Sequence, residues 1–178
     1  MFILYLRIMQ NFEQRLSGGH PNSLGNTVEV TDEVLAANEH FDELFNCYFS
    51  EDEIVRLRTS SAMKRICQSK KELLLPYLDR FLTEISQIDQ PSTKWTLAIL
   101  FGMLKENFTL EQFAQAKAII KKNLVEDDWI VLNYSMETLF NWSKDDEKLK
   151  TWLLPHLERL QKDSRKSVAK RASKLMEK

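Results

Sequence analysis

Apolar residues recur along most of the chain at the spacing of an amphipathic α-helix. Phe113, Ala116, Ile120 and Leu124 are typical, because each follows the last by three or four residues. That spacing places apolar side chains on one face of a helix. The alternation of apolar and polar residues that a half-buried strand requires is not sustained anywhere. The pattern therefore predicts an all-α protein.

Short polar breaks separate the helical stretches from residue 27 onward. The predicted helices are 27–37, 39–49, 52–67, 70–86, 92–106, 109–124, 127–143, 145–161 and 164–176. An earlier helix is predicted to end near residue 16, because Phe2, Leu6, Met9, Phe12 and Leu16 follow one face. In an alternative interpretation translation begins at Met9, and the first eight residues do not belong to the native protein.

The helices also repeat along the chain. Acidic residues open four turns at Asp52, Asp89, Asp127 and Asp163, with separations of 37, 38 and 36 residues. The residue nine positions after each aspartate is expected near the middle of the following helix, and these residues are Ser61, Ala98, Met136 and Ala172. A helical hairpin leaves one face uncovered, so such repeats stack on one another. We expect the four aspartates to cap the helices that follow them.

A second echo lies in the helices that precede these turns. The segment 74–80, LLPYLDR, matches 153–159, LLPHLER, at an offset of 79 residues, about two periods. With these features the chain resembles the HEAT-repeat family of the armadillo-like α-solenoids. The resemblance covers about 39–176. It implies a right-handed α-solenoid of about four to five HEAT-like helical hairpins, with a concave surface lined by the second helix of each hairpin.

The chain departs from the family pattern at one position. HEAT repeats carry an Asp and, six residues later, an Arg; here only Asp52 and Arg58 keep both, and the later sixth positions are Trp95, Asn133 and Ala169. We divide the chain into N-terminal capping helices over 1–38, with a Gly-rich loop at 17–26, and an array over 39–178. The expected repeats are about 39–67, 70–106, 109–143 and 145–176.

Composition narrows the range of functions. Hydrophobic residues are 43% of the chain and charged residues 29%, whereas Gly and Pro number only four each, which argues against a loop-rich β-sandwich. The net charge of −1 gives no strong overall field. Two cysteines cannot build a disulfide scaffold, so we expect a reducing compartment and a cytoplasmic protein. Arg7 interrupts the apolar N-terminal run, so we expect no membrane span.

The resemblance implies interaction rather than catalysis. We therefore predict a non-enzymatic module that binds another protein on its concave face through shape and a few aromatic and Arg anchors. The expected contacts are Arg56, Arg58, Lys94, Trp95, Trp129 and Asn133. From the loop we add His20, Asn22 and Asn26. This loop enters a helix capped by Asn26 or Thr27 and has two interpretations, a plain turn or an anion site made of backbone N–H groups.

Nucleic-acid binding is the alternative function. Residues 159–178 hold eight basic and two acidic residues, and Lys166, Lys170, Arg171 and Lys174 are candidate anion-binding residues. The same helix could simply be a polar cap on the array. Some HEAT-like DNA alkylation repair glycosylases resemble this architecture and use tryptophans with an Asp; here Asp128 precedes Trp129, where a helix N-cap is the simpler explanation.

No pattern of catalytic residues emerges. His20, His40 and His156 have no metal-type spacing with one another or with Cys47 and Cys67. No Ser lies in a nucleophile elbow. We therefore predict no catalytic residues, no metal and no cofactor. A small-molecule or tetrapyrrole-handling enzyme of the HEAT class is a third hypothesis, and only the unusual loop supports it.

Overall fold

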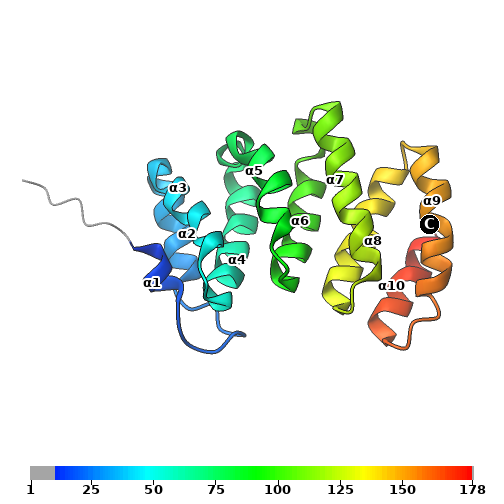
Figure 1. Ribbon diagram of the computed structural model, residues 1–178, viewed down its shortest axis with the longest axis horizontal. Coiled ribbons are helices and arrows are strands. Elements are labelled where there is room, and N and C mark those ends of the chain that lie inside the picture. The colour runs from blue at the N-terminus through cyan, green and yellow to red at the C-terminus, as the bar shows by residue number, and fades with distance from the viewer. Residues whose placement is uncertain (1–10, 178) are drawn as a thin grey trace, which may run out of the picture. The chain divides into compact units, whose positions relative to one another are not determined.

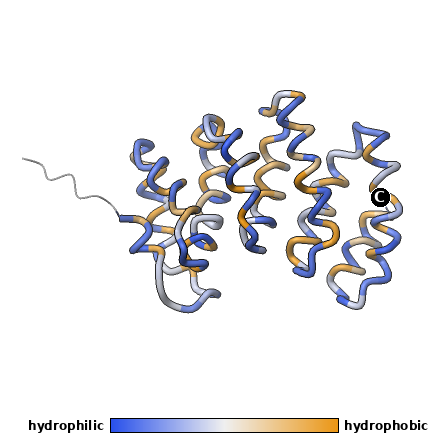
Figure 2. The backbone as a smooth tube through the Cα atoms, in the orientation of Figure 1, coloured by the Kyte–Doolittle hydropathy of each residue, from blue (hydrophilic) through white to orange (hydrophobic). Residues whose placement is uncertain are grey.

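The structure is a computed structural model that describes residues 11–177, and all regular secondary structure in this range is helical. This confirms the all-α prediction. The α-helices are α1 (Phe12–Leu16), α2 (Thr27–Ala36), α3 (Phe41–Asn46), α4 (Glu53–Lys70), α5 (Leu78–Thr83), α6 (Pro91–Met103), α7 (Leu110–Lys122), α8 (Trp129–Ser143), α9 (Glu147–Leu160) and α10 (Lys166–Met176) (Figure 1). In Figure 2, orange and blue segments alternate along the helices, as amphipathic helices require.

The helix boundaries follow the apolar pattern closely, with one clear exception. The predicted single helix over 70–86 is wrong: two 3₁₀ turns, Lys71–Leu73 and Leu75–Tyr77, separate α4 from α5. The backbone leaves the helical region at Lys70, with φ −152° and ψ 70°, and this ends α4. Pro76, which lacks an N–H, lies in the second 3₁₀ turn. Of the predicted N-terminal helix, α1 is the part that is described; Phe2, Leu6 and Met9 lie outside the described residues.

The four aspartates at the turns do not all act as caps. Asp52 does, since its Oδ1 accepts from the Ile54 N–H at 2.8 Å. At the third turn Asp128 caps α8 in place of Asp127. Asp89 does not cap α6, so the prediction is wrong there. Asp163 instead binds the side chain and the N–H of Arg165, at 2.8 and 2.9 Å.

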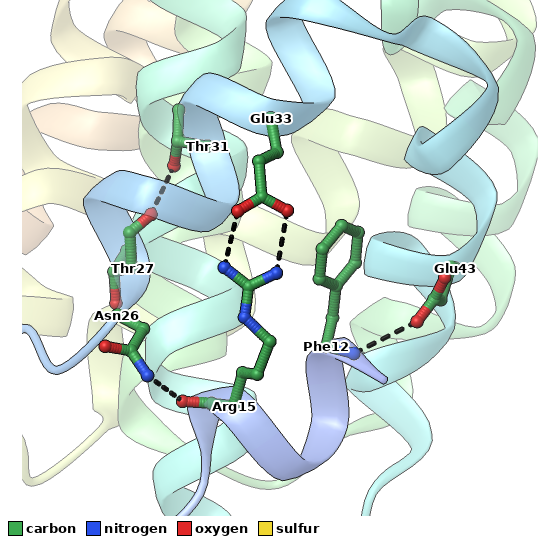
Figure 3. Close-up of polar contacts among 7 residues, drawn as sticks. All are labelled: Phe12, Arg15, Asn26, Thr27, Thr31, Glu33 and Glu43. Carbon is green, nitrogen blue, oxygen red and sulfur yellow. Dashed lines mark hydrogen bonds and ion pairs between the residues drawn. The ribbon is translucent and has the colours of Figure 1, made fainter. Parts of the chain in front are cut away.

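The chain divides into two compact units, the first ending at Met63 and the second beginning at Lys64. In the first unit, hydrogen bonds and an ion pair join α1 to α2 and α3 (Figure 3). The Arg15 guanidinium donates to both carboxylate oxygens of Glu33, at 2.6 and 2.7 Å, and the Phe12 N–H donates to Glu43 at 3.0 Å. The side chains of Phe12 and Leu16 are fully buried beneath these bonds.

In the second unit α6, α8 and α10 lie side by side (Figure 1). The buried Thr138 Oγ1 of α8 donates to the Ala98 carbonyl of α6 at 2.9 Å. Just beyond the ends of the same two helices, Lys105 donates to Asp145 at 3.2 Å, again across 40 residues. Both contacts join residues 40 positions apart, at two points along the helices, so α6 and α8 run parallel. Each residue of α6 therefore lies beside the residue of α8 about 40 positions later.

Candidate functional site

A groove of about 400 Å³ runs along the exposed side of α6 and α8. We call it the α6–α8 groove, and its lining residues are Ile99, Gly102, Met103, Lys105, Tyr134, Glu137, Thr138, Asn141 and Trp142. Met103 is 37% exposed and Tyr134 is 38% exposed. These are large side chains that folding leaves in contact with water. An apolar surface of this kind stabilises a complex when a partner covers it.

The groove lies over tightly packed helices. A Cβ atom added at Gly102 would lie 3.4 Å from Thr138 Oγ1, which is an ordinary contact distance. Packing therefore does not require glycine at this position. The absence of a side chain leaves room in the groove. Trp142 is 2% exposed, and its ring meets Phe113 edge-on with centroids 5.0 Å apart. Among the described residues, the buried indole N–H of Trp142 has no acceptor.

Ion pairs balance the charges at the rim of the groove. Lys105 pairs with Asp145 at 3.2 Å, and Glu137 pairs with Arg171 of α10 at 3.0 Å. Further out, Lys166, Lys170 and Lys174 of α10 are exposed and form no ion pair within the described part of the chain. We call these three lysines the basic edge. The rim is therefore neutral, and the surface beyond it is positive.

A second groove, of about 680 Å³, lies among α8, α9 and α10. Its apolar lining includes Phe140, Leu157 and Leu154, and Leu154 is 48% exposed. A smaller cavity of about 260 Å³ contains Lys94. Burial lowers the pKa of Lys94, but hydrogen bonds to Asp89 at 2.6 Å and Glu126 at 2.8 Å outweigh it, so the net pKa is raised. Its ammonium group is therefore engaged within the chain.

The other residues of the second unit that were predicted as partner contacts differ in how exposed they are. Trp129, at the first turn of α8, is 49% exposed, and Trp95 on α6 is half-buried. Asn133 is buried, so its prediction as a surface contact is wrong; its Oδ1 has no hydrogen-bond donor among the described residues. Trp95 lies one turn before Ile99 on α6 and is not among the residues that line the α6–α8 groove.

The prediction of Arg58 as a surface contact is also wrong, because this side chain is 3% exposed. Its Nη1 donates to the carbonyls of Leu16 at 2.6 Å and Ser17 at 3.1 Å, and its Nε donates to Ser23 at 3.3 Å. We call this arrangement the Arg58 clasp. Arg56 is half-buried and donates to the Ser50 carbonyl at 2.6 Å.

The Gly-rich loop is organised around this guanidinium. Gly25 has a φ of +50°, and a Cβ there would lie 2.7 Å from Arg58 Cζ. The candidate residues His20, Asn22 and Asn26 are exposed. His20 Nδ1 accepts from the Asn22 N–H at 3.1 Å, and Asn26 donates to the Arg15 carbonyl at 3.0 Å instead of capping α2 (Figure 3). The loop is therefore held by hydrogen bonds to Arg58 and Arg15 as well as by one between its own residues.

The described residues hold little reactive chemistry. Within 11–177 no group of three or more His, Cys, Asp and Glu side chains is arranged to hold a metal ion. Cys47 and Cys67 are buried free thiols, and burial raises their pKa values to about 12 and about 11. Asp128 accepts from the N–H groups of Ile130 and Val131 at 2.8 and 3.0 Å, which confirms its N-cap role.

The residues that form the groove are mostly ones that the sequence interpretation missed. Tyr134 and Met103 lie off the buried faces of α8 and α6, at helical positions where a polar residue is expected. An aromatic or apolar side chain on the polar side of an amphipathic helix is the signal that identifies both. Gly102 gives a similar signal, since glycine inside a helix is unfavourable unless close approach requires it.

Comparisons with protein-family models, with curated proteins and with solved structures find no match to this chain. No helix in the described range combines the length and the apolar character needed to cross a bilayer. The class that the structure defines is thus an all-helical protein whose second unit carries an exposed groove.

Proposed function

We propose that this chain is a non-enzymatic binding protein that holds a segment of another protein on the face formed by α6, α8 and α10. The observation that carries the proposal is the exposure of Met103 and Tyr134 in a groove whose base is the packed contact between α6 and α8. Exposed aromatic and apolar side chains on a rigid support are typical of residues that dominate binding energy.

We further propose that the helices form HEAT-like repeats of an α-solenoid. Two observations support this: the bonds from α6 to α8 that span 40 residues at both levels, and the sequence echo between 74–80 and 153–159. In such an array the second helices line one surface, which would include the α6–α8 groove. We also infer a reducing, cytoplasmic environment from the two free cysteines.

The test is affinity capture with the double variant Met103→Ala, Tyr134→Ala. Tagged protein is incubated with lysate of the source organism, divided into nuclease-treated and untreated halves, and bound proteins are identified by mass spectrometry. We expect a defined partner that survives nuclease and is lost with the double variant. Leu110→Ala is the matched control, because Leu110 is 92% exposed but lies on α7, outside the groove. Equal capture by the double variant and the wild type would refute the proposal.

Nucleic-acid binding is the second candidate, and the exposed basic edge of α10 is the observation that favours it. A glycosylase-like activity has less support, since the Asp128 carboxylate is occupied in capping α8. If nucleic acid is the ligand, recovery of bound material should collapse after nuclease treatment, and replacing Lys170 and Lys174 should have a larger effect than replacing Tyr134.

A further inference from the structure

We infer that the partner segment bound in the α6–α8 groove carries an apolar residue that anchors it and acidic residues next to that anchor. An apolar side chain of the segment would lie over Gly102, and Asp or Glu side chains next to it would reach Lys170 and Lys174 of the basic edge. This inference rests on the proposed function and adds the chemistry of the partner.

Helix α10 lies against α8 and next to the groove. The Arg165 guanidinium, just before α10, donates to the Asp127 carbonyl just before α8, and Arg171 meets Glu137 at 3.0 Å midway along the two helices. Contacts at the start and at the middle mean that α8 and α10 run parallel. Lys174 lies one turn beyond Arg171, as Asn141 of the groove lies one turn beyond Glu137. The basic edge therefore runs alongside the groove.

Among the described residues, the charges at the rim of the groove are paired, whereas those of the basic edge are not. Lys105, Asp145, Glu137 and Arg171 neutralise one another in two ion pairs at the rim. The lysines of the basic edge have no such partners within 11–177. A bound segment consequently meets apolar side chains first and uncompensated positive charge beside them. Opposite charge on the partner would be favoured, and like charge would be disfavoured.

The residues that line the groove distinguish a peptide ligand from a nucleic acid. A single-stranded nucleic acid needs a basic groove with flat aromatic platforms. The groove instead has the aliphatic Ile99 and Met103 in its lining, and Tyr134 is the one exposed aromatic among its described lining residues. These features suit an amphipathic peptide better than a phosphate backbone.

The experiment is selection of a displayed library of random peptides of about 16 residues, roughly four helical turns. The folded full chain is the bait, and the net charge of the enriched sequences is the first readout. The affinity of one enriched peptide is then measured by fluorescence anisotropy. We expect enriched peptides to combine apolar residues with Asp and Glu. Their binding should weaken as NaCl rises from about 50 mM to about 500 mM, because salt screens exposed charges.

Charge reversal gives the decisive comparison. Lys170→Glu with Lys174→Glu should weaken binding of the enriched peptide at least about ten-fold. The matched control, Lys71→Glu with Lys148→Glu, changes net charge equally at exposed positions outside the groove and should leave binding within about two-fold. Tyr134→Ala should weaken binding of every enriched peptide, and circular dichroism should show unchanged helix content.

Each remaining outcome is decisive. Neutral or basic peptides that still depend on Tyr134 would overturn the acidic character and leave the proposed function standing. No enrichment, or enrichment indifferent to Tyr134→Ala, would overturn the groove as the binding site and with it the proposed function. Equal competition by an oligonucleotide of similar length would overturn the peptide and favour nucleic acid.

Discussion

In the Arg58 clasp of the first unit a charged side chain binds its own chain, whereas in the α6–α8 groove of the second unit large side chains remain exposed. Arg58 looks like a surface anchor in the sequence, yet the loop 17–26 and its approach supply three carbonyl acceptors that bury it. Met103 and Tyr134 look like ordinary helical residues, yet they are left exposed. A polar side chain is available to a partner only when its own chain does not satisfy it first.

Glycine shows the same contrast. In the clasp, Gly25 has a positive φ and lies so close to Arg58 that a side chain would collide with the guanidinium. In the groove, Gly102 has helical backbone and only ordinary contacts around it. The first glycine is required by folding. The second costs helix stability, and a partner that fills the space above it would explain its presence.

The largest effect is expected from Arg58→Met. The variant leaves the three carbonyls of the clasp, including the buried one of Leu16, without this donor, and it should lower the free energy of unfolding by about 3 kcal/mol in urea denaturation. Cys47 provides a local readout, because its raised pKa makes the buried thiol slow to alkylate at pH 8. Arg58→Met should speed that alkylation. The control is Arg56→Met, at a half-buried position two residues earlier, and it should lower the free energy of unfolding by less. An equal decrease for both variants would show that the bonds of the Arg58 clasp add no particular stability.

Gly25→Ala should come next in size. The added Cβ would lie 2.7 Å from Arg58 Cζ, in a left-handed backbone conformation. Gly18→Ala isolates the backbone part, since Gly18 also has positive φ but nothing within 4 Å of its Cβ. We expect about 1 kcal/mol of destabilisation for Gly18→Ala and at least about twice that for Gly25→Ala. Identical melting temperatures for the two variants would contradict the close packing of the loop on Arg58.

Gly102→Ala should act in the opposite direction on stability. Alanine favours a helix, so the free energy of unfolding should rise by about 0.5–1 kcal/mol. The new methyl group would occupy the groove, so affinity for a selected peptide should fall about ten-fold, or about 1.4 kcal/mol. Unchanged affinity in a more stable protein would mean that no partner side chain lies over this residue.

The smallest effect is expected from Asp163→Asn. Hydrogen bonds from Arg165 lower the pKa of Asp163 to about 2, against 3.8 for a free carboxyl group. A lowered pKa stabilises the folded state above pH 3.8, and that contribution is lost as the pH falls through about 2. The variant should be less stable than the wild type at pH 6, by at most about 1 kcal/mol. Near pH 2 thermal melts of the two proteins should converge, and a difference that persisted there would point to another cause.

The extents of the helices were largely predictable because burial needs an apolar residue every three or four positions. The prediction over 70–86 failed at Lys70, where the backbone leaves the helical region although no glycine or proline stands there to signal the end of α4. The motif LLP occurs around a 3₁₀ turn at Pro76 and inside a helix, α9, at Pro155. Local pattern does not distinguish the two outcomes.

The candidate site was less predictable. Trp129 is exposed as expected, whereas Arg58 and Asn133 are buried. The sequence marks which residues carry charge or rings, but exposure depends on what the neighbouring helices place against each side chain. Tyr134 belongs to a groove only because α6 lies beside α8.

The sequence by itself determined that the chain is helical, where most helices begin and end, and that its cysteines are too few for a disulfide scaffold, because these properties follow from local spacing and composition. Only the tertiary structure decided that Arg58 closes a loop and that Met103 and Tyr134 border a groove. Those outcomes depend on contacts between residues 42 and 40 positions apart, and no periodicity within one helix encodes which side chain such a contact will cover.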